Sequence, residues 1–138
     1  MKRVYVDCNI LIDWLLEREP YSLYAAKLIE LTETGEIKSY VSAVTLAITY
    51  YIIKKALNQK VADEFLKDSL SLFSFADIRA NTITKAINNK YRDFEDDLHY
   101  YAAIDQSIEY LITRNKKDFR QEGIELLDAE QFVKRHSK

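Results

Sequence analysis

Two kinds of segment alternate along the chain: short apolar runs typical of buried strands, and longer stretches with the spacing of amphipathic helices. Strands are expected at residues 3–6, 37–41, 73–78, 110–113 and 124–127. Helices are expected at residues 10–17, 21–33, 44–55, 60–72, 81–89, 93–107 and 128–134, with a short helical turn at 115–119. Because helices separate consecutive strands, the pattern predicts right-handed crossovers and a mainly parallel sheet sandwiched between helices.

Capping residues mark the starts of several expected helices. Asn9, Ser42, Asp93 and Asp128 each precede a helical pattern, and their side chains are of the types that accept hydrogen bonds from first-turn amides. Only two glycines and one proline interrupt the sequence, so helices should dominate the fold.

The composition is that of a globular domain. The chain has 138 residues, of which 48% are hydrophobic and 30% charged, which excludes general disorder and suits a single domain over residues 1–138. No apolar run approaches the ~18 residues of a membrane span, and Asp7 interrupts the first strand before a signal-peptide core could form. We therefore expect a cytoplasmic protein with no membrane partner.

The charge and the cysteine count narrow the chemistry further. The net charge is −2, so the overall charge of the protein does not attract nucleic acid. Binding of nucleic acid would need a local basic patch, or metal ions that bridge acidic side chains to phosphates. The one cysteine, Cys8, excludes an internal disulfide and a multi-cysteine zinc site, and we expect it to pack as a small hydrophobic residue.

Acidic side chains follow two of the expected strands and begin a late helix. Asp7 ends the first strand, and Asn115 and Asp118 follow the strand at 110–113. Since parallel strands end at one edge of a sheet, Asp7 must lie near residues 113–118, and a helix that begins at Asp93 can present Asp96 to the same hollow. Crowded carboxylates raise one another's pKa unless a cation compensates, and Mg²⁺ and Mn²⁺ prefer such oxygen ligands.

A structural reading of the same acids stays open. Asp93 and Asp96 have the spacing of a helix cap and a favourable first-turn acid, and Asn115 and Asp118 repeat that spacing. Asp7 can simply accept amide hydrogen bonds from its turn. On this reading the acids stabilise helix ends and bind no metal.

Four segments of the chain carry a resemblance to a known family. Residues 6–13 (VDCNILID), 41–45 (VSAVT), 93–96 (DFED) and 112–119 (ITRNKKDF) resemble the signature segments of the PIN domain family. The resemblance is collinear, covers essentially the whole chain, and is closest to the prokaryotic branch that includes toxin ribonucleases of toxin–antitoxin pairs.

The resemblance implies a three-layer α/β/α sandwich that cleaves RNA with Mg²⁺ or Mn²⁺. It also implies an antitoxin protein as partner and a homodimer, for which the apolar helices at 21–33 and 44–55 offer surface. The catalytic residues it implies are Asp7, Asp96 and Asp118. The metal ligands it implies are Asp7, Asp96, Asn115 and Asp118, and the supporting residues are Asn9, Asp93 and Thr113.

The chain departs from the family pattern at one important position. The helix after the second strand commonly carries a glutamate in this family, and here Ile48 occupies that place with Thr49 beside it. Asn115 also stands where many relatives have an aspartate, for which Asp118 is the expected substitute. Weaker metal binding follows, and the alternative is a catalytically weak or inactive PIN-fold module that binds RNA or protein.

Other side chains near the acids have two readings each. Arg114 and Lys116 are candidates for phosphate binding, and the plain alternative is a solvated rim. His99 lies one turn beyond Asp96, where it serves either proton transfer or, as we favour, a surface or interface. Phosphoryl transfer through an aspartyl intermediate on Asp7 is disfavoured, because that chemistry usually wants a second aspartate where Asn9 stands.

Overall fold

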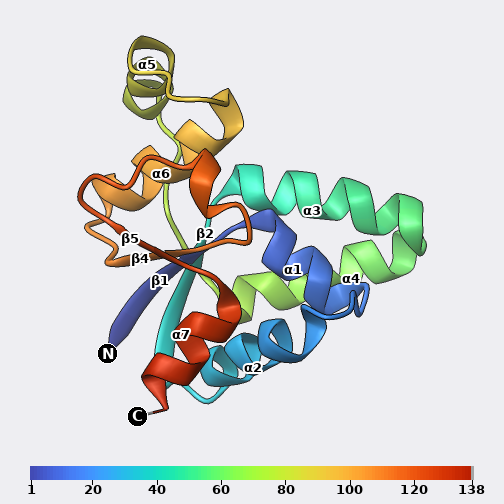
Figure 1. The fold of residues 1–138 in the computed structure, drawn as a ribbon. Helices are drawn as coiled ribbons and strands as arrows, with labels where there is room; N and C mark the ends of the chain where they lie inside the picture. Colours follow the sequence, from blue (N-terminus) through green and yellow to red (C-terminus); the bar gives the residue numbers. More distant parts are fainter. Residues whose placement is uncertain (138) are drawn as a thin grey trace.

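A five-stranded sheet, parallel throughout, runs through the middle of the computed structural model, which describes residues 1–137 (Figure 1). The strands lie in the order β3-β2-β1-β4-β5. Their bounds are Lys2–Val6 (β1), Ile37–Val41 (β2), Ser74–Phe75 (β3), Tyr110–Ile112 (β4) and Glu125–Leu127 (β5). Helices cover both faces of the sheet, so the predicted α/β sandwich is confirmed.

The central strand β1 ends beside β4, and this register positions the first acid. Val6 pairs with Ile112, and the Asp7 amide extends the ladder by donating to the Ile112 carbonyl at 3.0 Å. The Thr113 amide in turn donates to the Leu127 carbonyl at 2.9 Å. The residues that follow β1 and β4 therefore start at the same level, at the carboxyl edge of the sheet.

Two apolar layers form the core, one on each face of the sheet. Alternate residues of β1 point to opposite faces: Val4 packs in the layer under α1, α2 and α7, and Tyr5 packs in the layer under α6. The helices are Cys8–Leu15 (α1), Ser22–Glu33 (α2), Ala43–Ala56 (α3), Gln59–Leu72 (α4), Ala80–Asn88 (α5), Phe94–Asp105 (α6) and Ala129–His136 (α7). Within residues 1–137, none of these helices is both long and apolar enough to cross a bilayer.

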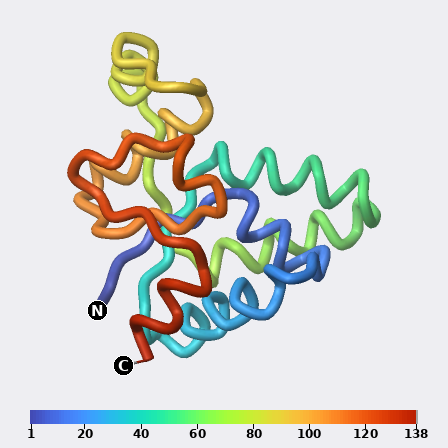
Figure 2. Tube along the Cα trace, viewed as in Figure 1, coloured from blue at the N-terminus to red at the C-terminus, as the bar shows by residue number. Residues whose placement is uncertain are grey.

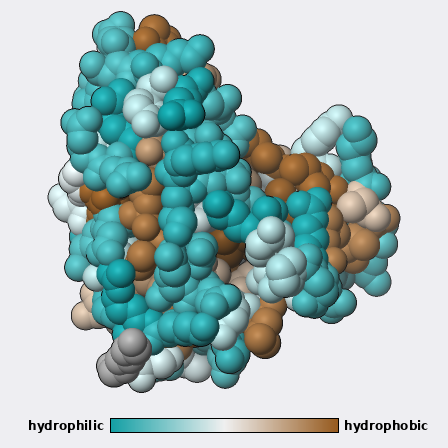
Figure 3. Space-filling view, in the orientation of Figure 1, coloured by the Kyte–Doolittle hydropathy of each residue, from teal (hydrophilic) through white to brown (hydrophobic). Residues whose placement is uncertain are grey.

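Helices α3 and α4 pack on each other as a hairpin that extends to one side of the sheet, while α5 packs against α6 at the far end (Figures 1 and 2). The hairpin carries brown, hydrophobic surface in the space-filling view (Figure 3). Its exposed apolar side chains include Tyr51 and Leu70, which are 61% and 72% exposed. The hairpin therefore presents apolar surface that the core of one chain does not use.

The predicted caps are confirmed at three helices and wrong at one. The side chains of Ser42, Asp93 and Asp128 accept amide hydrogen bonds at the starts of α3, α6 and α7. The first helix is capped by Asp7 and not by Asn9, which lies inside α1, because Asp7 keeps an extended backbone while its carboxylate accepts from the next amide.

The third strand is shorter than predicted. It covers Ser74–Phe75 instead of residues 73–78, because it pairs only with the last two residues of β2 at the edge of the sheet. Its short length leaves the neighbouring acid edge, at the ends of β1 and β4, unchanged.

Candidate metal centre at the carboxyl edge of the sheet

Asp7 is held at the junction of β1 and α1 by three hydrogen bonds. Its Oδ1 accepts from the Cys8 amide at 2.7 Å, and its Oδ2 accepts from Thr113 Oγ1 at 2.7 Å and from Asn9 Nδ2 at 3.1 Å. The residue is 4% exposed. A carboxylate has about four acceptor sites, so these bonds orient Asp7 and leave acceptor capacity for a ligand.

Burial and charge act on Asp7 in opposite directions. Burial raises the pKa of the Asp7 carboxyl, while the charge of His99 and the hydrogen bonds from Thr113 and Cys8 lower it. The Glu95 charge raises it again. Because the net pKa shift is upward, the ionised form of Asp7 is less stable here than in water, and a cation nearby would stabilise it.

Asp96 lies in the first turn of α6 and feels the Asp7 charge. Burial is the largest cause that raises the pKa of Asp96 to about 7, followed by the charges of Asp7, Asp93 and Glu95. The Asp93 side chain caps the helix by accepting from the Asp96 amide at 3.2 Å. The fold thus brings the carboxylates that follow β1 and that begin α6 within electrostatic reach of each other.

We expect this raised pKa to make stability depend on pH in a way that Asp96→Asn removes. In the folded chain Asp96 keeps its proton up to about pH 7, and the unfolded chain releases it near the ordinary value of 3.8. Stability from this group is therefore complete below pH 3.8 and falls as the pH rises to about 7.

The measurement is a set of melting temperatures in chelator between pH 4 and pH 8. The melting temperature of Asp96→Asn minus that of the unchanged protein should rise from pH 4 to about pH 7. Above pH 7 this difference should stay constant. A difference that is constant with pH would show that Asp96 titrates normally.

Glu95 and Asp97 flank Asp96 and point in different directions. The Glu95 Oε1 lies 3.6 Å from the His99 Nε2, on the side of the centre. The Asp97 carboxylate is 2% exposed and accepts from the Tyr91 amide at 2.9 Å, which closes the preceding turn. Glu95 therefore lies at the site, although the predicted metal ligands do not include it. The sequence around Glu95 does not show which face of α6 meets the sheet.

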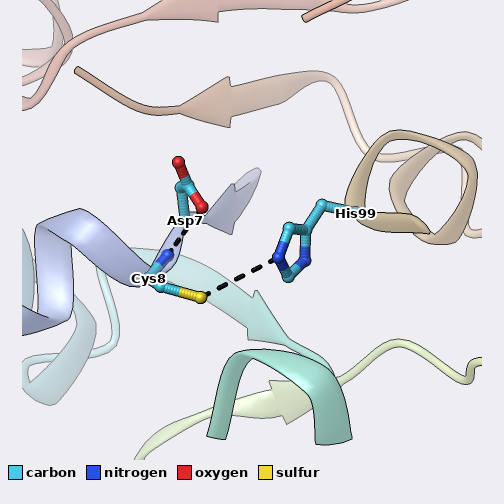
Figure 4. A group of neighbouring side chains, drawn as sticks. All are labelled: Asp7, Cys8 and His99. Atoms are coloured by element: carbon cyan, nitrogen blue, oxygen red, sulfur yellow. Dashed lines mark hydrogen bonds between the residues drawn. The ribbon is translucent and has the colours of Figure 1, made fainter. Parts of the chain in front are cut away.

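His99 is buried, and the expectation of a surface or interface histidine is wrong. Its Nδ1 lies 2.6 Å from the Tyr5 hydroxyl. Its Nε2 lies 3.8 Å from the Cys8 Sγ (Figure 4). The Tyr5 hydroxyl also bonds Ser42 and Thr45 at the start of α3. One signal in the sequence pointed to this burial: two alanines follow His99 by one helical turn, and such small residues allow a helix to pack closely on a sheet.

The segment after β4 contributes Thr113 directly, and its other candidates lie further out. The Asn115 amide donates to Thr113 Oγ1 at 3.1 Å, and the Asn115 side chain is exposed. Asp118 is half-buried in the 3₁₀ turn Lys116–Asp118. Within residues 1–137, the Asp118 carboxylate makes no hydrogen bond or ion pair, and its role as a ligand stays a prediction.

The two candidate phosphate-binding cations already have acidic partners. The Arg114 guanidinium makes paired hydrogen bonds to the fully buried Asp13 at 2.7 and 3.1 Å and stacks over the Tyr21 ring, 4.2 Å from its centre. Lys116 Nζ contacts Gln131 at 2.7 Å and Asp128 at 3.7 Å. Binding of phosphate by either residue competes with these contacts.

A cavity of about 450 Å³ opens next to the acid edge. Asn115, Arg114 and Lys117 line one side of it, and the rings of Tyr21 and Tyr24 line another. Asp13, Asp128 and Glu130 line it as well, so the cavity combines cationic, acidic and aromatic groups a few residues from Thr113.

The sequence matches the family description "PIN domain" over residues 3–117. The chain belongs to the PIN domain family. It is 26% identical to "Ribonuclease VapC1" of Aquifex aeolicus over 139 residues, which cover 97% of this chain and 95% of that protein. This confirms the resemblance read from the four sequence segments.

Solved structures of a VapBC complex and of the toxin VapC20 share the architecture. The DNA-bound VapBC complex of Salmonella typhimurium contains a chain that is 17% identical, with a TM-score of 0.67 over 94% of this chain and 99% of that one. The Mycobacterium tuberculosis toxin VapC20, described as cleaving the sarcin–ricin loop, is 12% identical with a TM-score of 0.65 over 87% of this chain and 92% of that one. At these identities the structures establish the fold.

Proposed function

We propose that this protein is a ribonuclease that requires Mg²⁺ or Mn²⁺ and hydrolyses RNA phosphodiester bonds. The observation that carries the proposal is the placement of Asp7 and Asp96 at the carboxyl edge of a PIN-family sheet, where burial first, and then the Asp7 charge, raise the pKa of Asp96 to about 7. The ribonuclease relative, which aligns with nearly the whole chain, supports the choice of RNA as substrate.

The donor set fits a hard divalent cation. Asp7 and Asp96 would hold it, with Asn115 and Asp118 as further oxygen donors, since these residues offer only oxygen ligands and the two carboxylates destabilise each other's charge. When bound, such an ion supplies Lewis acidity that polarises a phosphate and activates water for hydrolysis. Asn9 and Thr113 keep the Asp7 carboxylate oriented, and Asp93 caps the helix that presents Asp96.

The neighbouring cavity is the proposed path for the RNA chain. Lys117 adds positive charge there for the backbone, against the acids Asp13, Asp128 and Glu130 of the same lining. Bases can stack on the ring of Tyr24, and on that of Tyr21 from the face that Arg114 does not cover. Lys116 lies at the rim and would meet phosphates once it leaves Gln131.

The test is cleavage of defined RNAs by purified protein that has been stripped with a chelator. We expect cleavage after Mn²⁺ or Mg²⁺ is restored and none in the chelator. RNA binding without cleavage at any metal concentration would favour the alternative, a PIN-fold binding module, for which the observation is Ile48 in place of the family glutamate.

We further propose that the protein acts as the toxin of a toxin–antitoxin pair in the cytoplasm. The support is that PIN-fold neighbours occur in VapBC complexes, including one bound to DNA. Induced expression in a bacterial host should stop growth, and Asp7→Asn should restore it at equal protein level. Normal growth with soluble, folded protein would count against the toxin role.

A homodimer is proposed from the apolar surface of α2 and of the α3–α4 hairpin. Leu23, Tyr51 and Leu70 are each more than half exposed. Sedimentation at micromolar concentration should give twice the chain mass. A monomer at that concentration would contradict the proposal.

A further inference from the structure

We propose a second metal site, for a thiophilic divalent ion of the Zn²⁺ class, formed by Cys8, His99 and Asp7 with Glu95 as fourth ligand. One donor atom from each of Asp7, Cys8 and His99 lies within 4.8 Å of the others, and all three residues are buried (Figure 4). Nitrogen, sulfur and carboxylate oxygen are the ligand types that Zn²⁺ takes in proteins.

The hydrogen bonds around His99 leave Nε2 available as a ligand. The Tyr5 hydroxyl has one proton and donates it to Ser42 Oγ at 2.9 Å. Its oxygen, 2.6 Å from the His99 Nδ1, therefore accepts the Nδ1 proton. In the neutral ring the lone pair is then on Nε2, and a hydrogen bond from the other ring nitrogen is the usual support of a metal-binding histidine.

The spacing of the donors around Nε2 is close to that of a tetrahedral site. Cys8 Sγ lies 3.8 Å away and Glu95 Oε1 lies 3.6 Å away. Zn–S and Zn–N bonds of about 2.3 and 2.1 Å hold sulfur and nitrogen roughly 3.6 Å apart in a tetrahedron. Small movements would therefore place Asp7, Cys8 and His99 on one ion, and Glu95, which lies against His99, would turn towards that ion as the fourth ligand.

A second observation points to a ligand in the same place. Thr49 is fully buried, and its Oγ1 has no hydrogen-bond partner within residues 1–137. Burial raises the pKa of the Cys8 thiol, and hydrogen bonding by the Thr49 side chain is among the causes that lower it, although the Thr49 hydroxyl has no contact of full hydrogen-bond geometry. An ion that deprotonates the thiol gives the Thr49 hydroxyl a charged acceptor.

The two metal sites would exclude each other because they share Asp7. This consequence rests on the proposed function, while the binding of the thiophilic ion does not. An ion on Cys8 and His99 takes the remaining lone pairs of Asp7, so it would displace Mn²⁺ from Asp7 and Asp96 and switch off cleavage.

The test uses Co²⁺ as a spectroscopic substitute for Zn²⁺. The protein should bind one Co²⁺ with a near-ultraviolet thiolate-to-metal charge-transfer band that equimolar Zn²⁺ abolishes. Cys8→Ser and His99→Gln should lose the band, and Asp96→Asn, which leaves all four ligands in place, should keep it. Co²⁺ binding without the band, or a band that survives in Cys8→Ser, would overturn the proposal.

Two further measurements keep the test decisive. Zn²⁺ should raise the melting temperature of the unchanged protein by several degrees and leave that of Cys8→Ala unmoved, and an equal rise in both would overturn the proposal. Mn²⁺ binding, followed by its electron paramagnetic resonance signal, should weaken at least tenfold when Zn²⁺ is present. If Mn²⁺ fails to bind at all, the proposed nuclease centre is wrong, and the Co²⁺ band still decides the thiophilic site.

Discussion

Replacing Asp7 or Asp96 by asparagine should lower RNA cleavage by about a hundredfold or more while the fold stays intact. A cation held by both carboxylates supplies several kcal/mol of transition-state stabilisation, and a hundredfold corresponds to about 2.7 kcal/mol. Asparagine keeps the shape of the side chain and its amide-accepting oxygen but removes the charge that binds the ion. The measurement is the initial rate of cleavage of a labelled RNA at saturating Mn²⁺.

Asp68→Asn is the matched control for this pair. Asp68 is an exposed acid on α4, far from the carboxyl edge in the chain, so its neutralisation should leave the rate unchanged. Melting curves of Asp7→Asn and Asp68→Asn should stay close to that of the unchanged protein, and Asp96→Asn should melt at the same or a higher temperature, as its raised pKa requires. Cleavage that persists in both Asp7→Asn and Asp96→Asn would place the activity elsewhere.

The arrangement of strands and the position of Asp7 could be predicted because both follow from local rules. Alternating apolar runs and helical stretches imply parallel crossovers, and parallel strands end at one edge, so Asp7 and Thr113 had to lie together. The structure joins them by a hydrogen bond of 2.7 Å. The cap at Asp93 likewise fixed where α6 begins and so placed Asp96 in its first turn.

Side chains that depend on helix docking could not be predicted in this way. Residues 97–100 of α6 are buried without interruption, because the helix lies between the sheet and other chain segments, so periodicity does not reveal that His99 faces Tyr5 and Cys8. The cap of α1 was misplaced by two residues for a related reason. Asp7 and Asn9 are both of the residue types that cap helices. Only the hydrogen bond from the Asp7 amide to the Ile112 carbonyl shows that the extended backbone continues to Asp7.

The pair formed by Asp13 and Arg114 is another contact that no local pattern shows. The two residues are 101 positions apart, and they meet only when α1 docks on the loop after β4. Arg114 was predicted as a phosphate ligand, and the structure gives it a stabilising partner inside the protein. Loss of the Arg114 side chain should therefore lower the stability of the fold more than it weakens RNA binding.

Replacing Arg114 by alanine should destabilise the protein by about 3 kcal/mol, which is the lower end of the cost of breaking a buried ion pair. The Asp13 carboxylate is 0% exposed, and without the guanidinium it would keep a buried charge with no cation against it. The lower end applies because the Arg114 side chain is 26% exposed and solvent screens part of the interaction. A fall of about 10 °C in the melting temperature corresponds to this loss.

Three variants separate the structural role of Arg114 from binding of RNA. Arg114→Lys keeps the charge but loses the paired geometry, so it should fall between the alanine variant and the unchanged protein. Asp13→Asn combined with Arg114→Ala removes the stranded charge and should recover part of the loss. Lys116→Ala breaks only exposed contacts and should cost less than about 1 kcal/mol. If Arg114→Ala instead keeps the melting temperature of the unchanged protein and binds RNA more weakly, the guanidinium acts in RNA binding. The buried Asp13 would then need no ion pair with Arg114 for stability.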